Sequence, residues 1–448
     1  MTGRYKAYPE YKYSGVDWIK EIPSSWFISD LRRGIEFLTD FEANGSFSDV
    51  KNNVDLDSEG KYAWYLRATD LQNNRIGFTT GNRTVDEKAY RYLKKTALYG
   101  GELLVAKRGE IGKVYLVPEL NCKATLAPNL YLIRLNQLLN PRFALYWFLS
   151  SYGKPQLELA NKSTTIGALY KDDVRACKTL YPTIVEQQKI ANFLDHETAK
   201  IDTLIAKQEK LIELLKEKRQ AVISHAVTKG LNPDVPMKNS GVKWMGEVPE
   251  HWDLKRFKYL FKIRKRIAGK TGYDILSITQ KGIKIKDITS GEGQLSMDYS
   301  KYQLVYKGDF AMNHMDLLTG FVDISSHDGV TSPDYRVFTL EHKTSVAEYY
   351  LRLLQMGYLD KLFYPLGQGA AHIGRWRLPT EAFNEFIAPC PPYEEQKEIS
   401  HFVNKTHSKI DALLEKAEEA ITLMKERKTA LISAAVTGKI DVRDWGDL

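Results

Sequence analysis

The chain has 448 residues, of which 43% are hydrophobic and 27% are charged, and its formal net charge is +8. This length suits two to four domains, and the composition excludes a disordered chain. No apolar run is long enough to span a bilayer and the first residues carry no signal-peptide core, so we expect a cytoplasmic protein without membrane contacts. The three cysteines stand far apart without metal-ligand spacing, which indicates reduced thiols.

Two short connectors divide the chain. The first, residues 1–26, contains SGVDW followed by EIPSSW. The second, residues 232–252, repeats this pattern as SGVKW and EVPEHW, 226 residues later. Each connector precedes a module of similar length, so we interpret the chain as a duplicated scaffold that carries two diverged modules.

Module 1 covers residues 27–181 and module 2 covers residues 253–389. In module 1 the apolar segments predict strands near 62–69, 101–107, 113–118 and 129–135, and a core helix over 141–150. Module 2 echoes these segments only weakly. We expect both modules to share one α/β (mixed α+β) fold with different surfaces.

A long helical segment follows each module, first at 182–231 and then at 390–448, where the second includes the C-terminal tail. Residues 186–228 return without a gap at 395–437, and neither copy contains Gly or Pro. A charge-rich helix is usually a solvated surface element, but a second matching copy favours two helices of about 60 Å that pack antiparallel as a coiled coil. The order of connector, module and helix is a pseudo-twofold cyclic repeat. The apolar spacing predicts a seam through Ile201, Leu204, Leu211, Leu215 and Val222, and Ile205 and Ile212 widen this apolar stripe.

Catalytic motifs are few. GEIGK at 109–113 lacks the spacing and the hydroxyl residue of a phosphate loop, and NPRF at 140–143 is better explained as a helix start than as a methyltransferase motif. The strongest signal is Asp334 followed by Glu341 and Lys343, the pattern of a metal-dependent nuclease. Module 1 has no acid and no lysine in the corresponding stretch. We therefore favour a chain without catalysis of its own.

Binding signals are stronger, because both modules spread basic side chains among polar ones, which suits contacts to phosphates. The loop 368–377 adds small residues for a close approach, and its Gln and Arg side chains can bond base edges bidentately. Its counterpart in module 1 is 161–167. A single exposed basic residue is more often unspecialised than functional. The residues that we expect to contact DNA are Lys107, Arg108, Lys113, Asn161, Lys162, Arg264, Lys265, Arg266, Gln280, Lys281, Asn313, His314, Gln368, His372, Arg375 and Arg377.

The joint pattern resembles the specificity subunit of type I restriction–modification enzymes over nearly the whole chain. The resemblance rests on SGVDWIKEIPSSW and SGVKWMGEVPEHW, on PTIVEQQKIANFLD and PPYEEQKEISHFV, on the helix ends AVISHAVT and ALISAAVT, and on KGDFAMNHMDLLTGFVDISSHDGVTSPDYRVF. It implies that the modules are two target recognition domains, each reading one half of an interrupted DNA sequence. It also implies that the helices space these domains and help to dock two modification subunits, with restriction subunits added outside.

The resemblance places S-adenosylmethionine, ATP and Mg²⁺ on the partner subunits only, so the chain itself is expected to hold no cofactor and no metal. Two alternatives stay open. One is a metal-dependent endonuclease that uses Asp334, Glu341 and Lys343. The other is a coiled-coil adaptor that holds two protein-binding modules.

Overall fold

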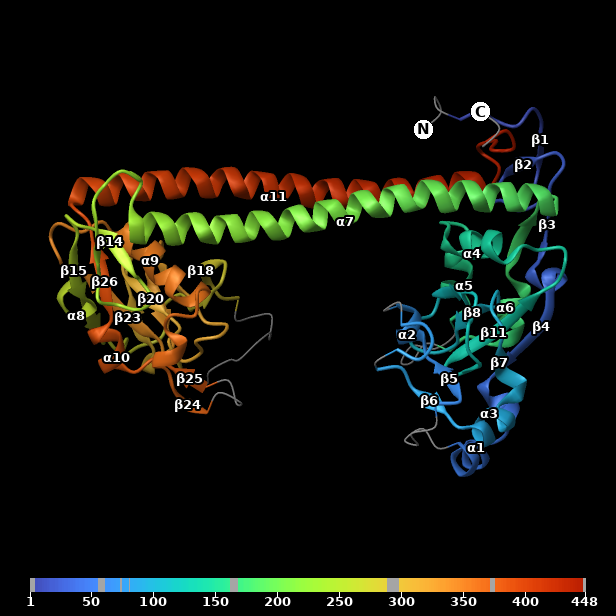
Figure 1. Cartoon of the computed structure of the whole chain (residues 1–448), viewed down its shortest axis with the longest axis horizontal. Helices are drawn as coiled ribbons and strands as arrows, with labels where there is room; N and C mark the ends of the chain where they lie inside the picture. The colour runs from blue at the N-terminus through green and yellow to red at the C-terminus, as the bar shows by residue number, and fades with distance from the viewer. Residues whose placement is uncertain are drawn as a thin grey trace. The chain divides into compact units, whose positions relative to one another are not determined.

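A computed structural model of the chain describes residues 5–54, 61–72, 75–79, 81–161, 168–287, 298–370 and 375–445. The chain divides into two compact units, Met1–Gln208 with Glu419–Leu448 and Glu209–Glu418 (Figure 1). Each unit holds one module and a part of both long helices, so the predicted boundaries between modules and helices stay predictions. Among the described residues, no helix is long and apolar enough to cross a membrane.

Module 1 is built on a four-stranded antiparallel sheet, whose order is β4 (Ile35–Asp40), β11 (Leu130–Leu135), β8 (Leu103–Ala106) and β9 (Val114–Leu116). A second sheet has the order β6 (Thr84–Val85), β5 (Ala63–Leu66), β10 (Ala124–Leu126) and β7 (Ala97–Leu98), with β5 and β10 parallel. Trp64, Leu104 and Leu132 share one core between the two sheets. All four strands predicted from the sequence are confirmed.

Module 2 repeats this arrangement despite its different sequence. Its antiparallel sheet has the order β16 (Phe261–Arg264), β23 (Arg336–Leu340), β20 (Phe310–Met312) and β21 (Val322–Ile324). The second layer holds the pair β19 (Gln303–Val305) and β22 (Gly329–Thr331) and the hairpin β17 (Leu276–Thr279) and β18 (Gly282–Ile285). A parallel bridge from Ile275 to Val330 matches the parallel pair of module 1. The expectation of one shared mixed α+β fold is confirmed.

Paired strands close each module. The first strand of module 1, β3 (Phe27–Asp30), pairs with the last, β12 (Lys178–Tyr181), and β15 (Asp253–Arg256) pairs with β26 (Ile387–Cys390) in module 2. The connectors form the ribbons β1 (Tyr11–Tyr13) with β2 (Glu21–Pro23) and β13 (Met237–Asn239) with β14 (Glu247–Pro249). The short helices are α1 (Phe47–Asn53), α2 (Ala68–Gln72), α3 (Glu87–Tyr92), α5 (Lys154–Leu159), α6 (Lys171–Ala176), α8 (Phe257–Leu260) and α10 (Thr380–Glu385).

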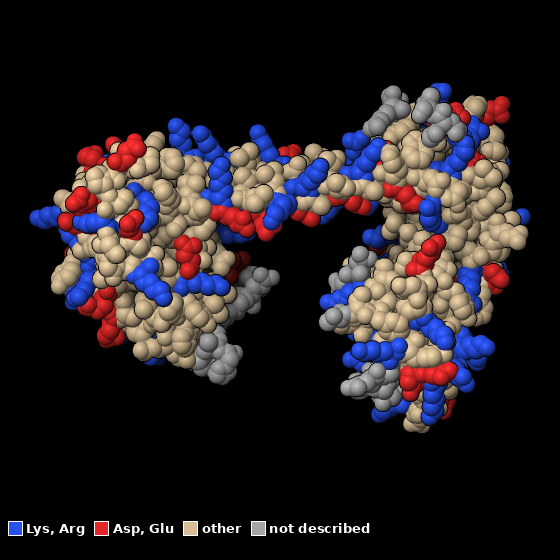
Figure 2. Space-filling model, in the orientation of Figure 1, with Lys and Arg blue, Asp and Glu red and all other residues tan. Residues whose placement is uncertain are grey.

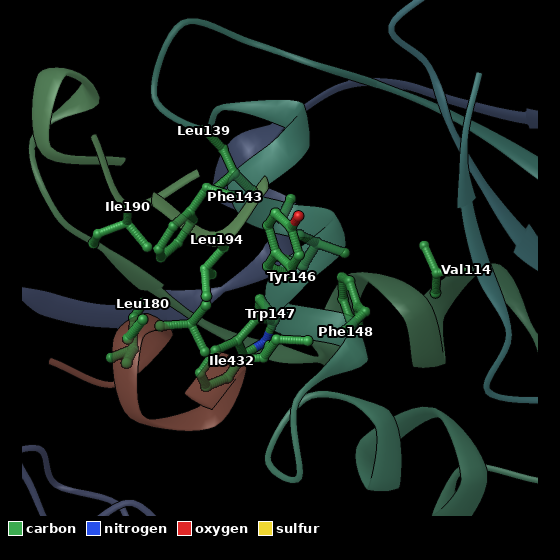
Figure 3. Close-up of a cluster of buried hydrophobic side chains, with 14 of the residues drawn as sticks. Val114, Leu139, Phe143, Tyr146, Trp147, Phe148, Leu180, Ile190, Leu194 and Ile432 are labelled. Carbon is green, nitrogen blue, oxygen red and sulfur yellow. The ribbon is translucent and has the colours of Figure 1, made fainter. Parts of the chain in front are cut away.

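The core helix of module 1, α4 (Pro141–Leu149), begins where the NPRF sequence predicts. The Asn140 side chain accepts hydrogen bonds from the backbone N–H groups of Arg142 and Phe143, which caps the helix. The apolar face of α4 then packs on the first long helix, α7 (Ile184–Lys229). Figure 3 shows Phe143 and its neighbours among side chains of α7 and of the second long helix, α11 (Tyr393–Val436).

Module 2 packs in the same way through α9 (Ala347–Leu359). Its Tyr349, Tyr350 and Leu353 share a core with the end of α7, at Ile223, and with the start of α11, at Ile399. Each module therefore rests on the beginning of the helix that follows it and on the end of the other helix.

A buried glutamine ties each core helix to its long helix. The Gln187 side chain accepts the Asn140 N–H at 2.8 Å and donates to the carbonyls of Leu138 and Pro182. The side chain of Gln396, its counterpart, accepts the N–H of the residue that precedes α9 and also donates to two carbonyls. The Gln of the repeated EQ pair is thus explained, because a side-chain amide supplies one acceptor oxygen and two N–H donors together.

The two long helices run antiparallel within each unit. In the first unit Lys428 pairs with Asp202 at 2.7 Å, and in the second unit Arg219 pairs with Asp411. These two ion pairs occupy equivalent positions of the repeat, because Asp202 corresponds to Asp411 and Arg219 corresponds to Lys428. The predicted antiparallel pairing is confirmed.

The predicted seam is partly wrong. Ile201, Ile205 and Leu215 are buried, but Leu204 is 50% exposed and Leu211 is 42% exposed. Two polar residues of α7 are half-buried, Gln208 between the two leucines and Arg219 beyond Leu215. The observed seam follows positions 201, 205, 208, 212, 215 and 219. It therefore includes two polar side chains, and Leu204 and Leu211 lie outside it.

The cyclic order of the repeat has a direct structural counterpart. In the first unit the connector contacts the tail of the chain: the Tyr11 hydroxyl donates to the Gly438 carbonyl at 2.9 Å, and the Asp441 N–H donates to the Lys6 carbonyl at 2.7 Å. In the second unit the Trp252 indole donates to Glu395 at 3.0 Å. Each connector therefore joins the end of one helix to the start of the other.

Candidate nucleic-acid interface

The end of β8 carries Lys107 and Arg108, and its backbone is fixed from two sides. The Lys107 N–H donates to the Asn129 carbonyl at 2.8 Å, and the Lys107 carbonyl accepts the Leu169 N–H at 3.1 Å. Arg108 forms a backbone bridge with Ala168. The backbone at the strand end is therefore fixed. Its two side chains, Lys107 and Arg108, differ in whether they have hydrogen-bond or ion-pair partners.

The Lys107 side chain forms ion pairs within module 1. Its ammonium group, which is mostly buried, pairs with Asp40 at 2.8 Å and with Glu42 at 2.9 Å, and Lys171 pairs with Asp40 at 3.0 Å. Burial alone raises the pKa of Asp40, but the hydrogen bonds from the two lysines outweigh it and hold that pKa below its usual value. This network neutralises the charge of Lys107, so the residue is a weaker candidate for a phosphate contact than its type suggests.

Arg108 has the opposite surroundings. It is exposed, and within the described part of the chain its guanidinium group makes no hydrogen bond or ion pair. It lines three adjoining hollows of about 600, 500 and 480 Å³. Asn129 and Tyr65 line the first two of these hollows with it. This hollowed, basic rim is the best candidate interface in module 1.

His314 stands at the position of module 2 that corresponds to Lys107. Its carbonyl accepts the Leu378 N–H at 2.9 Å, as the Lys107 carbonyl accepts the Leu169 N–H. Burial and the guanidinium groups of Arg336 and Arg377 lower the pKa of His314 to about 3. The imidazole is therefore neutral at physiological pH, and it acts as a donor and acceptor and not as a phosphate-binding cation.

Arg336 lies beside His314, where Tyr131 lies in module 1. Tyr131 donates to the Leu169 carbonyl at 2.8 Å, and Arg336 donates to the Leu378 carbonyl at 3.0 Å. Arg336 is buried over the Phe383 ring, and burial lowers its pKa to about 10. It is thus a structural cation that makes the nearby surface more positive.

The loop expected to approach bases is a hairpin of β24 (Gln368–Ala370) and β25 (Arg375–Arg377). Gln368 pairs directly with Arg377, and both side chains are exposed. The hairpin therefore presents an amide and a guanidinium side by side, the two groups that bond adenine and guanine bidentately. His372 and Lys162 lie outside the described residues, as does the side chain of Arg375.

The other expected contacts divide between engaged and exposed side chains. Arg264 pairs with Glu341 at 2.6 Å, and Arg266 pairs with Asp309 under the Tyr306 ring. Lys113 pairs with Glu110 at 2.5 Å. Asn161 and Asn313 accept backbone N–H groups in their own loops. Lys265 and Lys281 are exposed, and Gln280 is exposed but donates to the Thr319 carbonyl at 3.4 Å. None of these observations tests DNA contact itself, so these assignments stay predictions.

The nuclease pattern is not brought together by the fold. Asp334 precedes β23 and Glu341 follows it, so the two carboxylates lie at opposite ends of an extended segment of about 20 Å. Glu341 is paired with Arg264. No group of three or more His, Cys, Asp or Glu side chains among the described residues could hold a metal ion.

The face drawn in Figure 2 shows Lys and Arg side chains spread over both modules, with acidic side chains among them. No broad acidic area faces the viewer. This distribution suits a backbone-positioning contact made of many separate cations. It also explains why counting basic residues in the sequence could not locate the interface.

Asn129 is the residue that the sequence analysis missed. It sits in the turn before β11 with φ 74°, exposed and next to Arg108. A signal was present, because Pro128-Asn129 and Pro333-Asp334 precede equivalent strands in the two modules.

Comparison with known proteins is consistent along the chain. The family model described as type I restriction modification DNA specificity domain matches residues 40–214. The MjaVIII specificity subunit of Methanocaldococcus jannaschii is 26% identical over 413 residues, which cover 87% of this chain and 89% of that subunit. These matches are all to type I restriction–modification specificity subunits, so the chain resembles members of that family over most of its length.

Two further likenesses extend the comparison. The Escherichia coli EcoBI specificity subunit is 23% identical over 274 residues, so the match spans 58% of this chain and 57% of that subunit. A chain from a solved structure of a type I restriction–modification complex has a TM-score of 0.67 at 14% identity, and the match covers 94% of this chain and 99% of that chain. The structural likeness shows that the fold, with two modules and long helices, is shared.

Proposed function

We propose that this chain is a DNA-specificity subunit that binds duplex DNA, and that module 1 and module 2 each recognise one half of an interrupted sequence. The observation that carries the proposal is one backbone frame with different side chains at equivalent surface positions. Leu169 and Leu378 hold equivalent strand ends, yet one end carries Lys107 and the other carries His314. A shared frame fixes the docking geometry, and different donors and acceptors select different bases.

The long helices carry the second part of the proposal, the docking of two modification subunits. Leu204 and Leu413 are equivalent in the repeat and are both 50% exposed. Leu214 and Leu423, also equivalent, are 48% and 57% exposed. Each compact unit therefore presents one leucine of each pair, outside the seam and open to solvent. Two matching apolar positions suit two copies of one partner.

We infer that methyl transfer, translocation and cleavage belong to partner subunits, which would bind S-adenosylmethionine, ATP and Mg²⁺. The separation of Asp334 from Glu341 supports this division for cleavage, since the two carboxylates cannot share one ion. The helices then serve as the spacer between the two half-sites.

Methylome sequencing of cells that carry the full complex tests the proposal. We expect one bipartite motif, with two defined halves and a fixed gap, and methylation that depends on this subunit. A continuous motif, or methylation that persists when the subunit is deleted, would contradict the proposal. The same data would give the gap that the helices set.

A further inference from the structure

The turn before the central strand of each module's antiparallel sheet presents an exposed polar side chain at one equivalent place. In module 1 it is Asn129, before β11, and in module 2 it is Asp334, before β23. Each follows a proline, Pro128 or Pro333. Neither side chain makes a hydrogen bond or ion pair within the described part of the chain.

Asn129 is held where an incoming base edge could meet it. Its carbonyl accepts the Lys107 N–H at 2.8 Å, which locks the turn to the end of β8. Its side chain lines the hollows of about 600 and 500 Å³, and Arg108 lines both of them as well. An amide and a guanidinium, each without a partner among the described residues, thus share one rim on a rigid support.

The chemistry of this pair matches base edges better than phosphates. A phosphate takes donors only, whereas the Asn129 amide offers a donor and an acceptor in one plane, as adenine N7 and N6 require. Arg108 beside it matches the O6 and N7 acceptors of guanine. Asp334 offers acceptors only, which suits the N4 amino group of cytosine. The two modules therefore carry different hydrogen-bond patterns at one repeated place.

We propose that this turn is a specificity-determining position in each module, with Asn129 and Arg108 reading adjacent bases in one half-site and Asp334 reading one base in the other. The inference rests on the proposed function and deepens it. It assigns Asn129 and Asp334 a role that the count of basic residues did not suggest.

The backbone gives a competing reason for asparagine. Asn129 has φ 74°, a left-handed conformation that asparagine tolerates better than most residues. Glycine tolerates it better still and has no side chain. Asn129→Gly therefore separates the two roles, because it keeps the turn and removes the amide. Lys20→Gly is a matched control, since Lys20 is an exposed residue of the first connector with φ 64°.

The experiment measures binding of the full complex to duplexes that carry each single base-pair change in the wild-type site. Asn129→Gly should fold normally and lose about 5- to 150-fold discrimination at one base pair, within one half-site only. Asn129→Asp should shift the preference at that same base pair toward one that presents an amino donor. Arg108→Lys should relax the adjacent base pair, and Lys20→Gly should change nothing.

Asp334→Asn supplies the second arm, and it should alter one base pair in the other half-site only. If Asn129→Gly keeps wild-type discrimination at every position, the amide serves the backbone alone and the inference is overturned. Loss of discrimination in both halves would overturn it as well. If the wild-type complex has no bipartite site at all, the proposed function fails first, so the two failures are distinguishable.

Discussion

Module 1 and module 2 hold equivalent leucine carbonyls with side chains of different charge. Beside the equivalent leucine carbonyls, module 1 places Tyr131 and module 2 places Arg336. Opposite Tyr131 lies Asp40, which binds two lysines. In module 2 the paired strands end with Arg264 opposite Val337, so the residues next along the two strands at this place are Lys265 and Arg336. In module 1 the Asp40 carboxylate offsets the positive charges of Lys107 and Lys171. In module 2 the same place holds the buried cation Arg336 and the neutral His314.

This difference shows that backbone hydrogen bonds determine the shared fold, whereas side chains determine the charge of the surface. The backbone bonds from Leu169 and Leu378 are the same in both modules and hold the strand ends. The side chains around these bonds are acidic in one module and basic in the other, and the backbone hydrogen bonds are the same in both. Recognition can therefore diverge while the frame stays intact, which is what two different half-sites require.

The largest effect should come from removing the balancing acid of module 1. Asp40→Ala leaves Lys107 and Lys171 without their shared carboxylate, so we expect the free energy of unfolding to fall by about 3 kcal/mol. Lys265→Ala, at the equivalent place in module 2, should change it by no more than about 0.5 kcal/mol. Chemical denaturation measures both variants. Equal losses would show that the two interiors do not differ as described.

The shared part of the frame should respond equally in both modules. Gln187→Ala and Gln396→Ala each remove three hydrogen bonds at a buried position, and each should cost about 2–3 kcal/mol. Hydrogen exchange at the peptides of α4 and α9 reports the two losses separately. A large loss at one position and none at the other would mean that the repeat is not equivalent at this joint.

Acid should destabilise the second unit before the first. The second unit holds His314, with a pKa of about 3, and His407, which burial and the nearby Arg352 and Arg219 hold at a pKa of about 4. The unfolded chain binds protons at these histidines near pH 6.5, so it holds more protons than the folded chain between pH 6.5 and about 4. Stability therefore falls as the pH falls through this window.

In the first unit the lowered pKa of Asp40 supplies stability that is lost only below about pH 4. We expect the second unit to lose about 1–3 kcal/mol between pH 7 and pH 4.5, measured by pulse-labelling hydrogen exchange. His407→Gln should flatten this dependence. An unchanged slope in that variant, or an earlier loss in the first unit, would contradict the assignment.

The smallest effect belongs to the helix ion pairs. Lys428→Ala and Arg219→Ala remove equivalent partners from Asp202 and Asp411, and each should cost about 0.5 kcal/mol because the pairs are partly exposed. Thermal unfolding at low and high salt measures them. A cost above about 2 kcal/mol for either variant would place that pair in the interior of the helix packing.

The sequence predicted the long helices well because two ungapped copies without Gly or Pro leave few alternatives. It placed Ile201, Ile205 and Leu215 in the seam correctly but misplaced Leu204 and Leu211. Residue type favoured these two leucines over Gln208 and Arg219, whose burial depends on the partner helix. The strands of module 1 were also predictable from their short apolar segments. Local pattern was sufficient wherever neighbours in sequence decide the structure.

The candidate interface was harder to predict, because its pairings are distant in sequence. Lys107 and Arg108 are adjacent and of similar type, yet Asp40 neutralises Lys107, while Arg108 has no ion-pair partner among the described residues. The sequence around Lys107 does not indicate that its partner is Asp40, which lies 67 residues earlier in the chain. Asn129 drew no attention because its neighbours in space, and not its neighbours in sequence, give it a role.

The central claim is that each module reads its own half-site on a common frame. The most direct measurement replaces residues 27–181 with the corresponding module of a related specificity subunit and sequences the methylome of cells that carry the complex. We predict that one half of the motif changes, while the other half and the gap between them stay the same. A change in both halves, or in neither, would contradict independent recognition by the two modules.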